Sequence, residues 1–401
     1  MAYVVDRAVP FRHRRLAGIA VLAVVLGLCA SGAARAADEG GGKQPVYIGA
    51  IYNLTGSQAG LDRPSARGAE LAVREANANG GVLRRPIRLI VRDGHSALPA
   101  VARATESLLH DYPRVAVLMG LSDTDMVSAA APIAARADRA FLTSGATSPR
   151  LPSSMPDHLM LACFGDNTQA AAAAEWLRRD RHARTVSVLF DSRMSYTILL
   201  HRYFDTKFRG LGGRVLAIVS YRPGTLAKAV AGVPKADAVY VAAGPDEAGR
   251  AVSLLRAAGH VSPIVGGDSF DVGGLWRSLP KLTGIYFTTH AYIAADNPNP
   301  RVVAFRKAYK ALYPGKRPDA FAALGYDAAR LLISAIRAAG SDEHEHVRAA
   351  LAATVEFEGV TGKLGYTPGN FVPQKDVTIV GVSRGTRSLV KQFVPDRVPP
   401  P

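Results

Sequence analysis

The segment YIGAIYNLTGSQAGLDRPSARGAELAVREANANGGVLRRPIRLIVRDG, residues 47–94, decides the fold class of this 401-residue chain. It opens and closes with apolar runs of strand length. Between them Ala69, Ala72, Val73 and Ala76 recur at the i, i+3, i+4, i+7 spacing of one buried helix face. The glycine pair that follows suits a helix end, where a positive φ is favoured. The segment therefore predicts a βαβ unit with parallel strands.

The same alternation of apolar strands and alanine-rich helices continues to about residue 290. Two βαβ blocks of similar length predict an α/β protein with two similar lobes, each built on a parallel central sheet. After about residue 300, three helical segments precede three short strands. The expected strands are 46–53, 87–93, 115–120, 140–144, 185–191, 214–220, 238–243, 263–266 and 285–289, followed by 363–366, 376–382 and 389–393.

Residues 1–36 have the pattern of a cleaved signal peptide. A basic stretch, RHRR at 12–15, precedes an uncharged apolar run at 16–28 and an A-x-A cleavage site. A membrane anchor is the alternative, but the apolar core is short for a bilayer. Lipidation of Cys29 is disfavoured, because Leu28 stands where a small residue is required. We therefore expect export to the periplasm, with Cys163 left as a single cysteine, buried and inert within an apolar strand.

The formal net charge is +16, of which residues 1–36 carry five arginines and one aspartate, so the remaining chain keeps 16 − 4 = +12. These basic residues are spread singly along predicted helix faces. Nucleic-acid binding requires them massed on one face, and we therefore expect no nucleic-acid partner. The excess charge can still steer anionic ligands.

Motifs for catalysis, metals and cofactors fail one by one. GDSFD at 267–271 lacks the last glycine of a nucleophile elbow, and GGGK at 40–43 lacks the spacing of a phosphate loop. HEH at 344–346 points its histidines to different sides of a helix. We expect no enzyme, no metal and no cofactor, with a small-molecule hydrolase as the third-ranked function.

Four polar loops follow predicted strands: NLTGSQAG, GLSDTD, TSGATS and GGDSFD. Ligands bind at such strand ends in open α/β sheets. Three of the loops offer hydroxyl and backbone donors that suit a carboxylate, and the fourth offers Asp268 for an ammonium. Turn chemistry explains the same composition, and Asp268 can equally cap a helix. Further on, Asp166 and Gln169 have the spacing of a capping box at a helix start.

In order along the chain, these segments resemble the type I periplasmic binding proteins of ABC transporters, in particular the leucine/isoleucine/valine-binding group. The resemblance covers almost the whole chain after residue 44, including AVLMGLSDTDMVSAAAPIA, FLTSGATSPRL, PIVGGDSF and ALGYDAARLLISAI. It implies two Rossmann-like lobes joined by three hinge crossovers. Lobe 1 would comprise residues 45–165 plus 291–361, and lobe 2 residues 166–290 plus 362–394.

The resemblance also implies site residues. By position, Thr124, Gly145 and Thr147 match residues that hold a ligand carboxylate and part of its ammonium, and Asp268 matches an acidic residue that takes the ammonium. Tyr196 roughly matches a family tyrosine. The chain departs from the family at Leu61 and Gly244, where aromatic residues often stand, and at Ala162, within a stretch that usually carries arginine.

The function implied is a monomeric binding protein whose lobes close over an amino acid or similar molecule and dock on an inner-membrane ABC permease. Hinge closure requires no chemical transformation. A soluble subunit of a sensory receptor, with the same fold, is the alternative.

Overall fold

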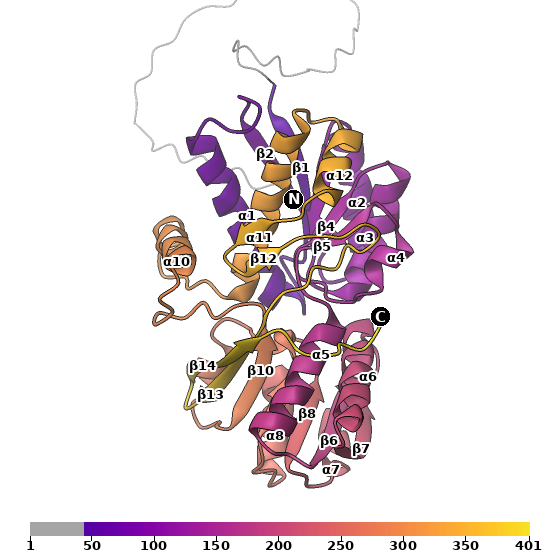
Figure 1. Cartoon of the computed structure of the whole chain (residues 1–401), viewed down its shortest axis with the longest axis vertical. Helices are drawn as coiled ribbons and strands as arrows, with labels where there is room; N and C mark the ends of the chain where they lie inside the picture. The colour runs from indigo at the N-terminus through magenta and orange to yellow at the C-terminus, as the bar shows by residue number, and fades with distance from the viewer. Residues whose placement is uncertain (1–43) are drawn as a thin grey trace, which may run out of the picture. The chain divides into compact units, whose positions relative to one another are not determined.

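The computed structural model describes residues 44–401 (Figure 1). The predicted signal peptide and Cys29 lie outside these residues. A five-stranded sheet and a seven-stranded sheet form the two halves of the described chain, and we call these halves lobe 1 and lobe 2.

The sheet of lobe 1 is entirely parallel, in the order β2-β1-β3-β4-β5. Its strands are β1 (Val46–Tyr52), β2 (Ile87–Asp93), β3 (Val117–Gly120), β4 (Phe141–Thr143) and β5 (Leu159–Leu161). The helices between them are α1 (Ala59–Ala78), α2 (Leu98–Asp111), α3 (Thr124–Arg136) and α4 (Leu151–Ser154).

The sheet of lobe 2 has the order β14-β13-β10-β9-β8-β6-β7, and only its last two strands along the chain, β13 and β14, are antiparallel to their neighbours. Its strands are β6 (Thr185–Asp191), β7 (Arg214–Tyr221), β8 (Ala238–Ala242), β9 (Ile264–Gly266), β10 (Ile285–Thr289), β13 (Val377–Ser383) and β14 (Thr386–Phe393). Its helical segments are α5 (Asp166–Glu175), the π-helical turn η1 (Trp176–Asp180), α6 (Ser195–Gly210), α7 (Leu226–Ala231), α8 (Ala248–Ala257), the 3₁₀ turn η2 (Asp268–Phe270) and α9 (Leu275–Ser278).

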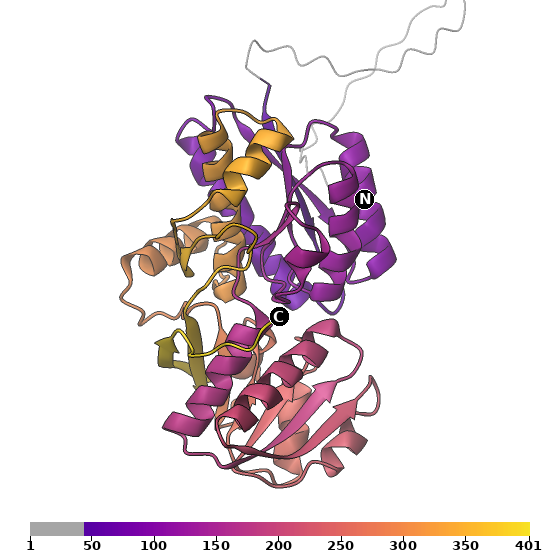
Figure 2. The same ribbon diagram turned by 45° about the vertical axis from the view of Figure 1, so that its right-hand side comes forward.

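After β10 the chain leaves lobe 2, packs three helices against lobe 1 and then returns. These helices are α10 (Pro300–Leu312), α11 (Ala320–Ala339) and α12 (His344–Ala352), followed by the hairpin β11 (Phe357–Gly359) and β12 (Gly362–Leu364). The chain then adds β13 and β14 beside β10 (Figures 1 and 2). The chain therefore passes between the lobes three times: from β5 to α5, from β10 to α10, and from β12 to β13.

Both sheets are covered by helices on both faces, so successive side chains along a strand point alternately into two cores. In β8, Ala238, Tyr240 and Ala242 face the core formed with α5 and α6. The intervening Val239 and Val241 face the core formed with α7 and α8. Among the described residues, no helix combines the length and apolar composition that crossing a membrane requires.

Two glycines bring α1 and α11 into backbone contact. A Cβ at Gly68 would stand 1.9 Å from the carbonyl oxygen of Ala322, and one at Gly325 would stand 1.9 Å from that of Ser65. Figures 1 and 2 show the two helices side by side. The predicted amphipathic helix is therefore confirmed, and it ends at a glycine pair with φ of 87° and 77°.

The predicted α/β class is confirmed, and the nine expected strands of the alternating part agree with β1–β4 and β6–β10 within two residues at each end. The prediction that Asp166 and Gln169 form a capping box was wrong. Gly165, not Asp166, is the N-cap of α5, and no side chain caps this helix. The reason is tertiary, because the carboxylate of Asp166 is engaged by Thr147 and Gln169 instead.

Candidate functional site

Loops from both lobes meet around a small enclosed space, which we call the cleft cavity. Its volume is about 10 Å³, room for about one water molecule. From lobe 1 come residues at the start of α1 and between β3 and α3, and from lobe 2 residues that follow β6, β8 and β9. Its lining consists of Gln58, Leu61, Ser122, Asp123, Met194, Tyr196, Pro245, Asp268 and Ser269.

Asp268 is a buried carboxylate held by donors on several elements. The Tyr196 hydroxyl and the Gln169 Nε2 amide donate to its Oδ1 atom, at 2.8 and 2.9 Å. The Nε2 atom of His290 lies 3.0 Å from its Oδ2 atom. Its backbone N–H donates to Gln169 Oε1 at 3.0 Å. These contacts fix the orientation of the carboxylate at the cavity wall.

His290, directly after β10, supports Asp268 from behind. Its ring is stacked on Phe164, with centroids 4.0 Å apart, and meets the edge of Phe321. Burial lowers the pKa of His290, despite the opposing effect of Asp268. The ring is therefore neutral at pH 7, and it donates one N–H to Asp268 without bringing a positive charge of its own.

Gln169 extends this network to lobe 1. Its Nε2 donates to Asp166 Oδ1 at 3.0 Å, and the same oxygen accepts the hydroxyl of Thr147 at 2.6 Å. The Thr288 hydroxyl donates to Gln169 Oε1 at 2.8 Å. Burial raises the pKa of Asp166 well above its ordinary value. Thr147 and Asp268 are thus connected through two side chains across the crossover from β5 to α5.

Asp123 caps the helix that points into the cleft cavity from lobe 1. Its Oδ1 accepts the backbone N–H groups of Asp125 and Met126, at 3.0 and 3.1 Å. Burial, and then repulsion by Asp125, raise its pKa to about 6. Two of the free N–H groups in the first turn of α3 are therefore occupied by the chain's own carboxylate.

Asp62 lies behind the cleft cavity in α1 and is completely buried. Its Oδ2 accepts the backbone N–H of Asn53 at 2.8 Å, and its Oδ1 has no hydrogen-bond partner within the described residues. Burial raises its pKa to about 7, and repulsion by Asp123 contributes. Lobe 1 thus brings two interacting carboxylates to this region.

The lobes also touch beside the cleft cavity. The backbone N–H of Ser195, at the start of α6, donates to Asp125 Oδ2 at 3.0 Å. This contact joins the N-terminal turn of α3 to that of α6. The cavity is small because the lobes meet around it.

Two of the five sequence-predicted site residues, Tyr196 and Asp268, line the cleft cavity, and their side chains bond each other. Thr124, Gly145 and Thr147 are buried nearby on lobe 1 but do not line it. The Thr124 hydroxyl has no partner within the described residues, whereas the Thr147 hydroxyl is donated to Asp166. A Cβ at Gly145 would lie 2.9 Å from Ser122 Oγ, so a larger residue there would press on the cavity wall.

The residues at which the chain departs from the family pattern can also be located in the structure. Leu61 lines the cleft cavity as an apolar wall. A Cβ at Gly244 would lie 3.1 Å from Met194 Sδ, so a side chain there would displace Met194. The carbonyl oxygen of Ala162 accepts the buried Nζ of Lys375 at 3.1 Å. No aromatic ring except that of Tyr196 is part of the lining.

Sequence reasoning missed Asp123, Gln169 and His290 as parts of the site. Asp123 carried a usable signal, since an aspartate between a strand and a helix is a preferred N-cap. Gln169 was interpreted as a capping residue. His290 had no local signal, because only the fold brings it to Asp268.

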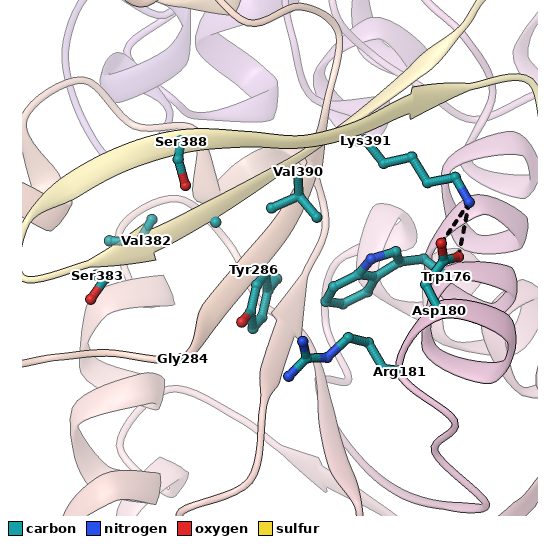
Figure 3. A pocket seen from close by; sticks show the side chains of 11 residues that line it. Trp176, Asp180, Arg181, Gly284, Tyr286, Val382, Ser383, Ser388, Val390 and Lys391 are labelled. Atoms are coloured by element: carbon teal, nitrogen blue, oxygen red, sulfur yellow. Dashed lines mark hydrogen bonds and ion pairs between the residues drawn. The ribbon is translucent and has the colours of Figure 1, made fainter.

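A larger pocket, of about 490 Å³, lies elsewhere on lobe 2, and none of its lining residues lines the cleft cavity. It lies between η1 and the strands β10, β13 and β14 (Figure 3). The Arg181 guanidinium stands 5.7 and 5.6 Å from the ring centroids of Trp176 and Tyr286. Lys391 pairs with Asp180 at 2.8 Å. Its cationic groups are thus already engaged by aromatic or acidic neighbours.

Cys163 is free and buried, as predicted, and its thiol donates to the carbonyl oxygen of Ala146 at 3.3 Å. Burial raises its pKa well above the ordinary value, so it is not a nucleophile at pH 7. Within residues 44–401, no group of three or more His, Cys, Asp or Glu side chains is arranged to hold a metal ion.

Comparison with known proteins gives one consistent result. Residues 45–387 match the family described as periplasmic binding protein. A Leu/Ile/Val-binding protein, BraC3, of Rhizobium johnstonii is 25% identical over 327 residues, which are 80% of this chain and 87% of the relative.

Two solved structures have similar folds. The leucine binding protein LivK of Thermotoga maritima is 29% identical, with a TM-score of 0.79 over 88% of this chain and 99% of the other. The branched-chain amino acid transporter substrate binding protein LivJ of Streptococcus pneumoniae, in complex with isoleucine, is 26% identical with the same TM-score and the same two coverages.

Proposed function

Because the chain belongs to the periplasmic binding protein family, we propose that it binds a small amine-bearing solute, an amino acid or related molecule, and delivers it to an inner-membrane ABC permease. The relatives named for leucine, isoleucine and valine support an aliphatic solute. The apolar wall of the cleft cavity, formed by Leu61, Met194 and Pro245, supports the same class.

One observation carries this proposal: Asp268 stands at the wall between the lobes as a buried, oriented carboxylate. Tyr196, Gln169 and His290 all approach it as donors, and none of them supplies a full positive charge in the neutral form of His290. A ligand ammonium in the cavity would provide that charge and form a charge-assisted hydrogen bond. Asp268 and Tyr196 are therefore our ligand-binding residues on lobe 2. Thr124, Gly145 and Thr147 stay predictions for lobe 1.

The mechanism is hinge closure between lobe 1, residues 45–165 plus 291–361, and lobe 2, residues 166–290 plus 362–394. A cavity of about 10 Å³ is too small for an amino acid, so the lobes must separate for the solute to enter and must stay further apart than in this structure when they close over it. Only the closed arrangement brings both walls to the ligand, and binding therefore shifts the population toward it. In this proposal the protein works as an exported periplasmic monomer and carries out no chemical step.

A ligand panel tests the proposal. The purified, dialysed protein is heated with amino acids, amino acid amides, aliphatic amines and simple carboxylates without an amine. A ligand at 100 times its Kd adds about 2.7 kcal/mol to the free energy of unfolding, which raises Tm measurably. We expect stabilisation only from compounds with an amine. Stabilisation only by carboxylates that lack an amine would refute the role of Asp268.

Substitution of Asp268 sharpens the test. Asp268→Asn keeps the size of the side chain and removes its charge, so the affinity for an amine should fall at least about tenfold, which is about 1.4 kcal/mol. Asp111→Asn is the matched control, because it removes the same charge from an exposed ion pair with Arg92. Equal loss of affinity in both variants would contradict a direct contact.

A further inference from the structure

Resting on the proposed function, we propose that Asp123 makes the lobe 1 wall anionic as well, so the solute is an aliphatic amine that lacks a free carboxylate. Such a molecule carries a hydrogen-bond donor at each end, as a diamine or an amino acid amide does. One end meets Asp268 of lobe 2, and the other meets Asp123 and Ser122 of lobe 1.

The first argument concerns the helix terminus. The N-terminus of α3 would suit a ligand carboxylate, because free N–H groups and the helix dipole favour an anion there. In this chain Asp123 occupies two of these N–H groups, since its Oδ1 accepts those of Asp125 and Met126. A second carboxylate would have to displace it or lie against it.

The second argument concerns charge. The nine lining residues include two carboxylates, Asp123 and Asp268, and no lysine, arginine or histidine. Asp62 and Asp166 stand behind them, and burial, with a smaller contribution from the charge of Asp123, raises the pKa of both, so each favours its neutral form. A ligand carboxylate would place a further negative charge beside Asp123 and Asp268, whereas a ligand with only cationic or neutral donors would not.

The third argument is a hydroxyl in the lining, that of Ser122, which lies close to the carboxyl of Asp62. Ser122 lines the cleft cavity and is 9% exposed, and its Oγ makes no hydrogen bond of good geometry within residues 44–401, although it lies near enough to Asp62 to lower the pKa of that carboxyl. A buried hydroxyl without a partner is costly, so a group that bonds it on binding contributes to affinity. Placed beside Asp123, its oxygen can accept from the same amine or amide N–H.

Isothermal titration calorimetry with three probes tests this inference: L-leucine, L-leucinamide and 1,4-diaminobutane. L-Leucine and L-leucinamide share the aliphatic side chain and differ in the free carboxylate. We expect L-leucinamide or 1,4-diaminobutane to bind at least tenfold more tightly than L-leucine. The titrations are repeated with Asp123→Asn, which preserves the cap, because asparagine is an equally good N-cap.

In Asp123→Asn the preference should shift by at least tenfold toward L-leucine, while the control Asp111→Asn keeps the wild-type order. If wild-type protein binds L-leucine more tightly than L-leucinamide, the inference is overturned, but the proposed function stands. If none of the three probes binds, or if Asp123→Asn leaves the order of their affinities unchanged, the proposed role of Asp123 is overturned. Acetate, titrated separately, tests the proposed function itself: binding of acetate without binding of any of the three amines would remove both the inference and the proposed function.

Discussion

A variant that lacks the ionisable group of Asp62 should lose less stability than the wild type as the pH rises above 5. The ordinary pKa of this carboxyl is 3.8, and burial raises it to about 7 in the folded chain. A raised pKa means that the folded state favours the protonated form. The stability that the protonated Asp62 contributes is therefore fully present below pH 3.8. It is lost as the pH rises from 3.8 through about 7. At 1.36 kcal/mol per pKa unit, the whole loss is about 4 kcal/mol, of which about 3 kcal/mol falls between pH 5 and pH 8.

The variant Asp62→Asn cannot ionise, so it should lack this loss. Its carbonyl oxygen can still accept the N–H of Asn53, and its amide can donate to the nearby Ser122 hydroxyl, which in the wild type lowers the pKa of Asp62. The measurement is urea unfolding followed by far-UV circular dichroism at pH 5, 6, 7 and 8.

We expect the free energy of unfolding of the wild type to fall relative to that of Asp62→Asn by about 3 kcal/mol across this range. Asp123, with a raised pKa of about 6, contributes in the same direction to both proteins. The control Asp111→Asn, at the surface, should follow the wild type. Parallel pH profiles for the wild type and Asp62→Asn would refute the reasoning, since they would show that Asp62 titrates alike in the folded and unfolded chains.

Three further outcomes follow from the packing. Gly325→Ala should destabilise the protein by at least about 2 kcal/mol in thermal unfolding, because its Cβ would meet the Ser65 carbonyl oxygen at 1.9 Å. A wild-type Tm in this variant would show that α1 and α11 are less close. Glu175→Gln should cost about 3 kcal/mol in urea unfolding, because it leaves the buried ammonium of Lys207, 2.6 Å from Glu175, without its carboxylate. A change below about 1 kcal/mol would mean that the pair is hydrated. Cys163 should react with a thiol reagent only at the rate of unfolding, and fast labelling of the native protein would contradict its burial.

Much of the fold was predictable from local pattern. The strands of the alternating region were found because each one is apolar and is followed by a polar loop, and the helix of α1 was found from its spacing and its terminal glycines. The boundary of α5 was harder to assign, because Asp166 and Gln169 fit a capping box equally well in sequence. Their side chains turn to Thr147 and Asp268 instead, and those partners come from other elements.

Periodicity and turn residues were sufficient to predict an α/β protein and to raise Asp268 as a candidate, since these features depend on neighbours in sequence. Tyr196 was singled out only by the resemblance of the ordered segments to a known family. The composition of the cleft cavity was not available at that level. Gln169 and Asp268 are 99 residues apart, and Asp123 meets their network only because the strand ends of the two sheets face each other. Hydrogen bonds and charge repulsion act over a few ångströms in space, so only folding decides which carboxylates share one cavity and which positive charge is missing from it.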